Sequence, residues 1–284
     1  MRIRAHALSI GLVAAIAVSG CGAEDSAKKA ASSAKDAIDP VAQAAETTSA
    51  QKGGIALTMK GGAEVAGQKV PIEGSGTVDR SGKSGTFSFT TSVGGQSMKV
   101  DQIIKDRVIY MSSPLFSQLP GGKKWVKLDL NAELAKQGVD LDALGGGTTQ
   151  DPAAALEYLK GAGPSKELGT ETINGTKTTH YHVDADLSKV AGKAKDDDSR
   201  KAIEKLIQTS GVKTMPIDVW VDGEHLVRRE RIVYQAKEQG QTAKFDFTMD
   251  FTKYGVDVKA DAPPADQTAD FSDLLGAAGG TVNG

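Results

Sequence analysis

The sequence is poor in the residues that most catalytic and metal-binding sites require. Its 284 residues include one cysteine and four histidines, and aromatic residues make up only 5% of the chain. A single cysteine cannot form an internal disulfide, and no cluster of cysteine and histidine offers it zinc-binding partners. The scarcity of aromatic residues argues against a site lined by rings for sugars or nucleobases.

No charge of one sign dominates either. The chain carries 34 basic and 36 acidic side chains, for a formal net charge of -2. A nucleic-acid-binding domain needs a strongly basic surface to displace counterions from phosphates. We therefore expect no nucleic-acid partner.

Hydrophobic runs long enough to span a membrane are also absent, and the one short run lies at the start of the chain. Arg2 and Arg4 precede an apolar stretch from Leu8 to Val18, the layout of a secretory signal peptide. The Val-Ser-Gly-Cys that follows resembles a bacterial lipobox, in which the cysteine is diacylated, for example with palmitate, and the chain is cut before it. We expect residues 1–20 to be a lipoprotein signal peptide and Cys21 to anchor the protein to the extracytoplasmic face of the cell membrane. The alternative is an ordinary secretory peptide with an incidental cysteine.

Composition divides the remainder into three parts. Residues 21–52 are rich in Ala, Lys, Asp and Ser and read as a tether that ends in a helix near 41–51. Residues 53–262 contain the apolar patterns of one folded domain. Residues 263–284 form a polar, glycine-rich tail that we expect to be flexible.

The domain is dominated by runs in which apolar and polar residues alternate, the period of a half-buried strand. About ten such runs are separated by short turns, and Asn174-Gly175 has the sequence of a type I′ hairpin turn. Two helices are expected, one at 151–161 after Asp151-Pro152 and one that begins near Asp198 or Ser199 and ends at Gly211. The fold class is therefore α+β with an antiparallel sheet.

Candidate sites for chemistry are weak. Gly82-Lys83-Ser84 resembles part of a phosphate-binding loop, but the spacing of the preceding glycine is wrong. His180, His182 and Asp184 share one face of a strand and are a metal candidate, although we expect the histidines to point to solvent. No nucleophile elbow is present, so we predict neither an enzyme, a cofactor nor a metal site.

The segment "MPIDVWVDGEHLVRRERIVYQ", residues 215–235, resembles the LppX/LprAFG lipoproteins of actinobacteria, which are similar in fold to the LolA and LolB carriers. Tyr254-Gly255-Val256 and Pro263-Pro264 extend the resemblance, which covers residues 53–264. It implies a strongly curved antiparallel sheet, an open half-barrel, with helices packed on the concave face around a lipid-sized cavity. The side chains then expected to face the cavity are Leu57, Met59, Ile72, Phe87, Phe89, Ile217, Val219, Val221, Phe245, Phe247, Met249 and Phe251.

The resemblance also implies a function, a membrane-anchored lipoprotein that binds or carries lipid or glycolipid. The alternative is an interaction or sensor lipoprotein that docks other envelope proteins and has a filled core, since any sheet packed on helices shows the same alternation. Trp220 fits neither expectation easily. It lies opposite Ile217, Val219 and Val221, so we expect it to be covered by a terminal segment or exposed.

Overall fold

The computed structural model describes residues 39–65, 67–80, 82–93, 95–106, 108–114, 116, 123–129, 163–192, 197–238 and 241–271. These residues belong to one compact unit that begins at Asp39. The predictions for the signal peptide, Cys21, most of the tether, the helix at 151–161 and the end of the tail lie outside the described residues.

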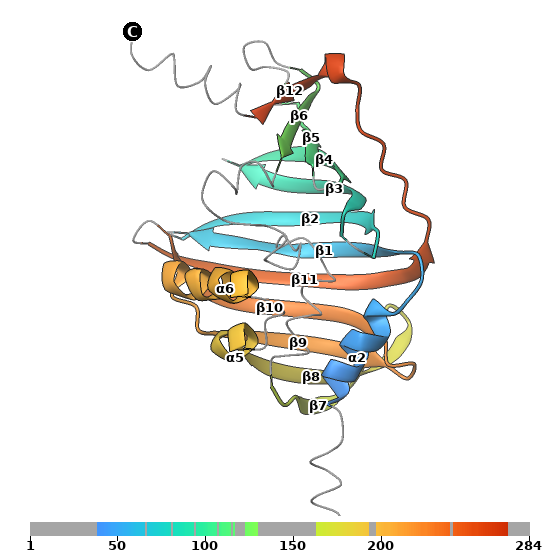
Figure 1. The fold of residues 1–284 in the computed structure, drawn as a ribbon, viewed down its shortest axis with the longest axis vertical. Helices are drawn as coiled ribbons and strands as arrows, with labels where there is room; N and C mark the ends of the chain where they lie inside the picture. The colour runs from blue at the N-terminus through green and yellow to red at the C-terminus, as the bar shows by residue number, and fades with distance from the viewer. Residues whose placement is uncertain are drawn as a thin grey trace, which may run out of the picture. The chain divides into compact units, whose positions relative to one another are not determined.

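The described part of the chain forms one large, curved and unclosed sheet with three helices (Figure 1). The sheet contains twelve strands in the order β12-β6-β5-β4-β3-β2-β1-β11-β10-β9-β8-β7. The elements are α2 Pro40–Ser49, β1 Gly54–Val65, β2 Gln68–Val78, β3 Ser84–Val93, β4 Gln96–Lys105, β5 Val108–Ser112, β6 Trp125–Asp129, β7 Lys166–Ile173, β8 Thr176–Asp186, α5 Leu187–Gly192, α6 Asp197–Ser210, β9 Thr214–Asp222, β10 Val227–Glu238, β11 Gln241–Val256, the 3-10 turn η2 Ala265–Gln267 and β12 Thr268–Asp270.

Two runs of consecutive antiparallel strands make up the sheet. β1–β6 form one half and β7–β11 the other, and the pairing of β1 with β11 joins them. The predicted α+β fold with an open antiparallel sheet is confirmed, with two differences. The sheet has twelve strands rather than about ten, and β12, in the segment expected to be a tail, pairs with β6 in parallel.

Local sequence explains the strands and their turns. In β1, Ile55 and Leu57 point inward and are buried, whereas Thr58 points outward and is exposed. This is the alternation that the sequence predicts. The β7–β8 hairpin turns at Asn174 and Gly175, which both have positive φ, 49° and 81°. Two consecutive positive φ values are what a type I′ turn requires, so this part of the hairpin prediction is confirmed.

The helices also follow their capping signals. The Asp39 carboxylate accepts hydrogen bonds from the backbone N–H groups of Val41 and Ala42, with Pro40 in the first turn. α6 begins at Asp197, slightly earlier than predicted, and ends before Gly211, whose φ of 72° stops the helix. The short α5 was not predicted, because six residues are too few to show helical periodicity.

All three helices pack against the β7–β11 half of the sheet (Figure 1). Val41, Ala44 and Ala45 of α2 are fully buried in a cluster with the inward residues of β8–β10. α5 and α6 form a second cluster with Ala236 of β10. α2 is therefore part of the folded unit rather than of the tether.

Replacing Gly175 by valine tests the hairpin. A β-branched residue resists the φ of 81°, although a Cβ there would meet no atom within 4 Å. We expect Gly175→Val to lower the free energy of unfolding by about 1 kcal/mol or more in chemical denaturation. Gly223→Val is the matched control, because its surroundings are equally open and its φ is not positive. Equal effects of the two substitutions would contradict the turn assignment.

Candidate functional site

One face of the sheet, here called the apolar face, carries the side chains that the sequence singled out. Cross-strand pairs place Leu57 opposite Phe251, Met59 opposite Met249, and Gly76 opposite Phe87. The same register runs through β9 and β10. All twelve predicted cavity residues lie on this face: Leu57, Met59, Ile72, Phe87, Phe89, Ile217, Val219, Val221, Phe245, Phe247, Met249 and Phe251.

The twelve residues divide by burial. Six are packed within the core and six are only half-buried. Val219 is 0% exposed and shares a cluster with α2. The buried six are Leu57, Phe87, Ile217, Val219, Val221 and Phe251, and the half-buried six are Met59, Ile72, Phe89, Phe245, Phe247 and Met249.

Phenylalanine rings on the apolar face lie over glycines of the neighbouring strand. A Cβ on Gly76 would come within 2.3 Å of the Phe87 ring, and one on Gly74 within 2.8 Å of the Phe89 ring. Gly61 has the same relation to Phe247, at 2.9 Å. The rings thus occupy the space that side chains would fill, and those of Phe87 and Phe89 are nearly parallel, 4° apart. Phe87 and Phe89 therefore cover glycines of β2, and Phe247 covers a glycine of β1.

Glu230 of β10 is an exception within this apolar surface. Its cross-strand neighbours are Val219 and Met249, and it is only 3% exposed. Its Oε1 atom accepts no hydrogen bond, and within the described residues it has no ion-pair partner. Burial without compensation raises the pKa of Glu230 to about 7. A carboxyl group that is easily neutral therefore faces the same way as Met249.

Sequence reasoning did not identify Glu230. It lies in "LVRRERIV", where charged residues occupy consecutive positions and hide the period of two. The register also shifts between Val227 and Arg229, so that β10 carries an irregularity just before Glu230. The signal that was present is the alternation of Glu230 with Ile232, which would have placed the carboxylate on the inward face.

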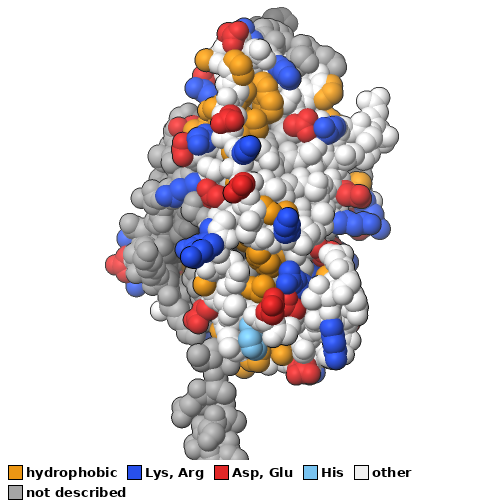
Figure 2. All heavy atoms as spheres, turned by 90° about the vertical axis from the view of Figure 1, so that its right-hand side faces the viewer, with side chains coloured by type: hydrophobic (Ala, Val, Ile, Leu, Met, Phe, Trp, Pro, Cys, Tyr) orange, Lys and Arg blue, Asp and Glu red, His pale blue; other side chains and the backbone are white. Residues whose placement is uncertain are grey.

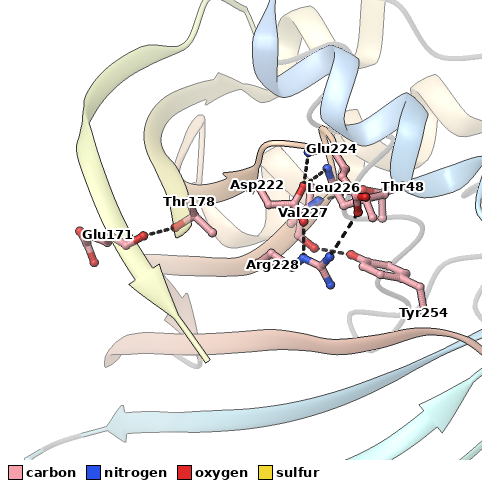
Figure 3. A network of polar contacts seen from close by, with 9 residues as sticks. All are labelled: Thr48, Glu171, Thr178, Asp222, Glu224, Leu226, Val227, Arg228 and Tyr254. Carbon is pink, nitrogen blue, oxygen red and sulfur yellow. Dashed lines mark hydrogen bonds and ion pairs between the residues drawn. The ribbon is translucent and has the colours of Figure 1, made fainter. Parts of the chain in front are cut away.

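The segment that carries the family resemblance forms a polar network at the β9–β10 turn (Figure 3). The Asp222 carboxylate accepts hydrogen bonds from the backbone N–H groups of Glu224 and Leu226, both at 2.9 Å, and from Arg228 at 2.5 Å. Its neighbour in the turn, His225, has a positive φ of 59°. Asp222 thus holds the turn in one conformation.

The same network attaches α2 and β11 to the start of β10 (Figure 3). The Val227 N–H donates to the Thr48 hydroxyl of α2 at 3.0 Å, and the Val227 carbonyl accepts a hydrogen bond from the Tyr254 hydroxyl. Burial raises the pKa of Tyr254, and the Arg228 guanidinium lies 5.3 Å from the centre of its ring. These contacts connect α2, β10 and β11, so the network stabilises the fold.

The opposite, polar face corrects the expectation for Trp220. Trp220 is 6% exposed, yet it is covered by neighbouring side chains rather than by a terminal segment. The His180 ring stacks on it with a centroid distance of 4.1 Å, and the Arg229 guanidinium lies 5.7 Å from its centroid. Stacking and cation–π contact let an aromatic residue be buried on an outward face.

The two histidines of the metal candidate meet carboxylates. His182 Nδ1 lies 2.8 Å from Asp218 Oδ1, and His180 Nδ1 lies 3.2 Å from Glu171 Oε1. The hydrogen bond to Asp218 raises the pKa of His182. Across the described residues, no group of three or more His, Cys, Asp or Glu is arranged to hold a metal ion.

A groove of about 840 Å³ also lies on the polar face. Its lining includes hydroxyl-bearing side chains of β1–β3 together with Arg229 and Asp250, which form a paired hydrogen bond with each other. Figure 2 shows one side of the molecule, where acidic and basic side chains are interspersed with small hydrophobic areas. Neither the groove nor this side offers the continuous apolar surface that an acyl chain needs.

Comparison with known proteins gives distant relatives. No family model matches the chain. The chain is 24% identical over 254 residues to an uncharacterised 31.2 kDa protein of Streptomyces griseus, covering 84% of this chain and 78% of that protein. It is 25% identical over 236 residues to a Streptomyces coelicolor protein provisionally named a lipoprotein, covering 76% and 70%.

Solved structures include similar proteins at low identity. LprF from Mycobacterium bovis has a TM-score of 0.43 with 13% identity, over 80% of this chain and 96% of that one. The Mycobacterium tuberculosis lipoprotein LppX has a TM-score of 0.41 with 15% identity, over 78% and 96%. No helix in the described ranges is long and apolar enough to cross a membrane.

Glu230 should make stability depend on pH. Because its folded pKa of about 7 lies above the ordinary value of 4.5, the folded state keeps a proton that the unfolded chain loses as pH rises between these values. The contribution of Glu230 to the free energy of unfolding is complete below about pH 4.5. It is lost as pH rises through 7, by roughly 3 kcal/mol at most.

Urea denaturation of the wild type and Glu230→Gln at pH 5 and pH 8 measures this contribution. The variant should be the more stable protein at pH 8 and should lose the difference at pH 5. Comparing the two proteins cancels the titration of His182, which both share. Glu73→Gln, at an exposed position, is the control and should track the wild type. Parallel pH profiles for wild type and Glu230→Gln would contradict the burial of an unpaired carboxyl.

Proposed function

We propose that this protein is a lipid-anchored, extracytoplasmic lipoprotein that holds acyl chains against the apolar face of its sheet and catalyses no reaction. Cys21 would attach it to the cell membrane, and its ligand would be a lipid or glycolipid. The provisional name of the Streptomyces coelicolor relative supports the lipoprotein assignment. So does the order of basic residues, short apolar run and Val-Ser-Gly-Cys at the start of the chain.

The observation that carries the proposal is the half-buried aromatic and methionine surface of β1–β3 and β11. Met59, Phe89, Phe247 and Met249 keep part of their surface accessible. The three described helices contact β8, β9 and β10 (Figure 1). Burying about 300 Å² of acyl chain there at about 25 cal/mol per Å² would supply roughly 7 kcal/mol before ordering costs. Because 1 μM corresponds to about 8 kcal/mol, binding would be in the micromolar range at best, with loose specificity.

A second function is favoured by the other half of the sheet. Val219 and Ile217 are fully buried in the cluster that includes α2, so this part of the apolar face is filled by the protein itself. If the filling extended over the whole face, the protein would be an interaction or sensor lipoprotein that docks another envelope protein. The two functions differ in whether lipid accompanies the protein.

Met59→Trp separates the two functions. Met59 is half-buried on the apolar face, whereas tryptophan at Val219 would strain the packed core under either function. For a lipid carrier, native mass spectrometry should find bound lipid on the wild type and little on Met59→Trp, with the melting temperature unchanged. Thr58→Trp, on the opposite face of the same strand, should keep the lipid. A lipid-free wild type and a Met59→Trp variant destabilised by about 1–3 kcal/mol would establish the filled core instead.

Cys21→Ala tests the anchor. We expect this variant to leave the membrane fraction or to remain unprocessed, because the thiol is the acceptor of the acyl groups. Its folded domain should melt at the wild-type temperature. Fractionation followed by immunoblotting, with Ser19→Ala as a control outside the acceptor position, measures the distribution. A processed Cys21→Ala protein that stays fully in the membrane would refute lipid attachment at this residue.

A further inference from the structure

Glu230 places one polar group within the apolar face. Its side chain is 3% exposed, and its cross-strand neighbours Val219 and Met249 are apolar. Val219 is fully buried and Met249 is half-buried, so the carboxyl lies between a packed and a partly accessible residue of the face. Its Oε1 has no hydrogen-bond donor in the described structure.

Such a group is costly to leave unsatisfied. Buried polar atoms are almost always hydrogen-bonded, and each exception needs a physical explanation. Among the described residues Ser49 Oγ, His180 Nε2 and Trp220 Nε1 also lack a hydrogen-bond partner, but Glu230 is the ionisable carboxyl among them. The buried Asp222 carboxylate, in contrast, accepts three hydrogen bonds at the β9–β10 turn. Replacing Glu230 by an apolar residue would remove the unpaired buried acceptor. The fold itself therefore gives no reason for a carboxyl at this position.

The surroundings define the chemistry of a donor that would suit it. Burial favours the neutral carboxyl, and the described residues supply no cation to it, so an anionic headgroup would be repelled whenever Glu230 ionises. An ammonium group would create a buried ion pair, whose two charges must both leave water. An uncharged hydroxyl can donate to Oε1 without either cost.

We propose that Glu230 is the polar anchor of the lipid site and selects acyl lipids that carry a free, uncharged hydroxyl next to their acyl chains, as diacylglycerols do. This inference rests on the proposed lipid-binding function. The acyl chains would lie against the half-buried side chains of Met59, Phe89 and Phe247, and the hydroxyl would donate a hydrogen bond to Glu230 Oε1.

Two lipids that differ only in the hydroxyl test the anchor. Dioctanoylglycerol has it, and dioctanoylpropanediol lacks it. Equilibrium dialysis with the radiolabelled lipids should give the wild type about a tenfold preference for dioctanoylglycerol, equivalent to about 1.4 kcal/mol. Glu230→Leu should bind both lipids with the affinity that the wild type shows for dioctanoylpropanediol. Glu230→Gln, whose amide oxygen also accepts a hydrogen bond, should keep most of the preference.

Controls separate the anchor from general effects on folding. Glu73→Leu removes a carboxylate from an exposed position on the other face and should leave the preference unchanged. The melting temperature of each variant shows whether it is folded. If Glu230→Leu does not fold, the comparison of the two neutral lipids on the wild type still tests the anchor, because equal affinities would overturn it. Dioctanoyl phosphatidic acid, which is anionic, should bind the wild type more weakly than dioctanoylglycerol.

The outcomes distinguish this inference from the function on which it rests. Binding of both neutral lipids with equal affinity, or an undiminished preference in Glu230→Leu, would overturn the anchor and leave lipid binding intact. Preference for a dioctanoyl aminolipid over dioctanoylglycerol would also overturn it, in favour of a buried ion pair. Binding of none of the lipids by the folded wild type would overturn the proposed function and the anchor together.

Discussion

The pairing of β1 with β11 holds the two halves of the sheet together. Every other antiparallel pair joins strands that are neighbours along the chain, whereas this one brings Gly54 to Val256. Closing so long a segment costs more entropy than any hairpin, and the apolar pairs Leu57–Phe251 and Met59–Met249 must offset it. The pairing also fixes the apolar face, because a slip of one residue would turn every side chain of β11 to the opposite side.

The two halves of that face are built on different principles. Over β8–β10, branched aliphatic side chains interdigitate with α2 and leave no exposed surface at Val219. Over β1–β3, Leu57 and Phe87 belong to the same buried cluster, while Met59 and Phe89 are only half-buried. The first region is close-packed throughout, and the second is packed only at one end of its strands. Glu230 lies between a packed and a partly accessible residue.

Short-range patterns predicted most of the strands and turns. The alternation in β1 and β11, the Asn174-Gly175 turn and the glycine after α6 each depend only on local backbone geometry, which the sequence states directly. The Asp39-Pro40 cap of α2 has the same form as Asp151-Pro152, but the polar composition around it indicated a tether. α2 packs on the sheet because Val41 and Ala44 contact residues of β9 and β10, which are far away in the sequence. No local sequence pattern predicts such a contact.

The site was less predictable than the fold. The twelve apolar candidates follow from periodicity, and they do share a face. Their division into packed and accessible residues depends on where the helices lie, which is a tertiary property. Trp220 was unexpected because its cover comes from His180 of the next strand. Glu230 was hidden by Arg229 and Arg231, which flank it in the sequence, and by the shift in register before it.

The docking of α2 places the start of the folded unit well before the first strand. The chain first joins the folded unit at Asp39, whose second carboxylate oxygen accepts hydrogen bonds from the Ser165 N–H at 2.7 Å and hydroxyl at 2.8 Å. If Cys21 is the anchor that we propose, the eighteen residues from there to Asp39 could span roughly 60 Å at most. Any tension on the chain before Asp39 would reach the sheet through α2 and the hydrogen bond between Thr48 and Val227. That load would act on β10, the strand that also carries Glu230.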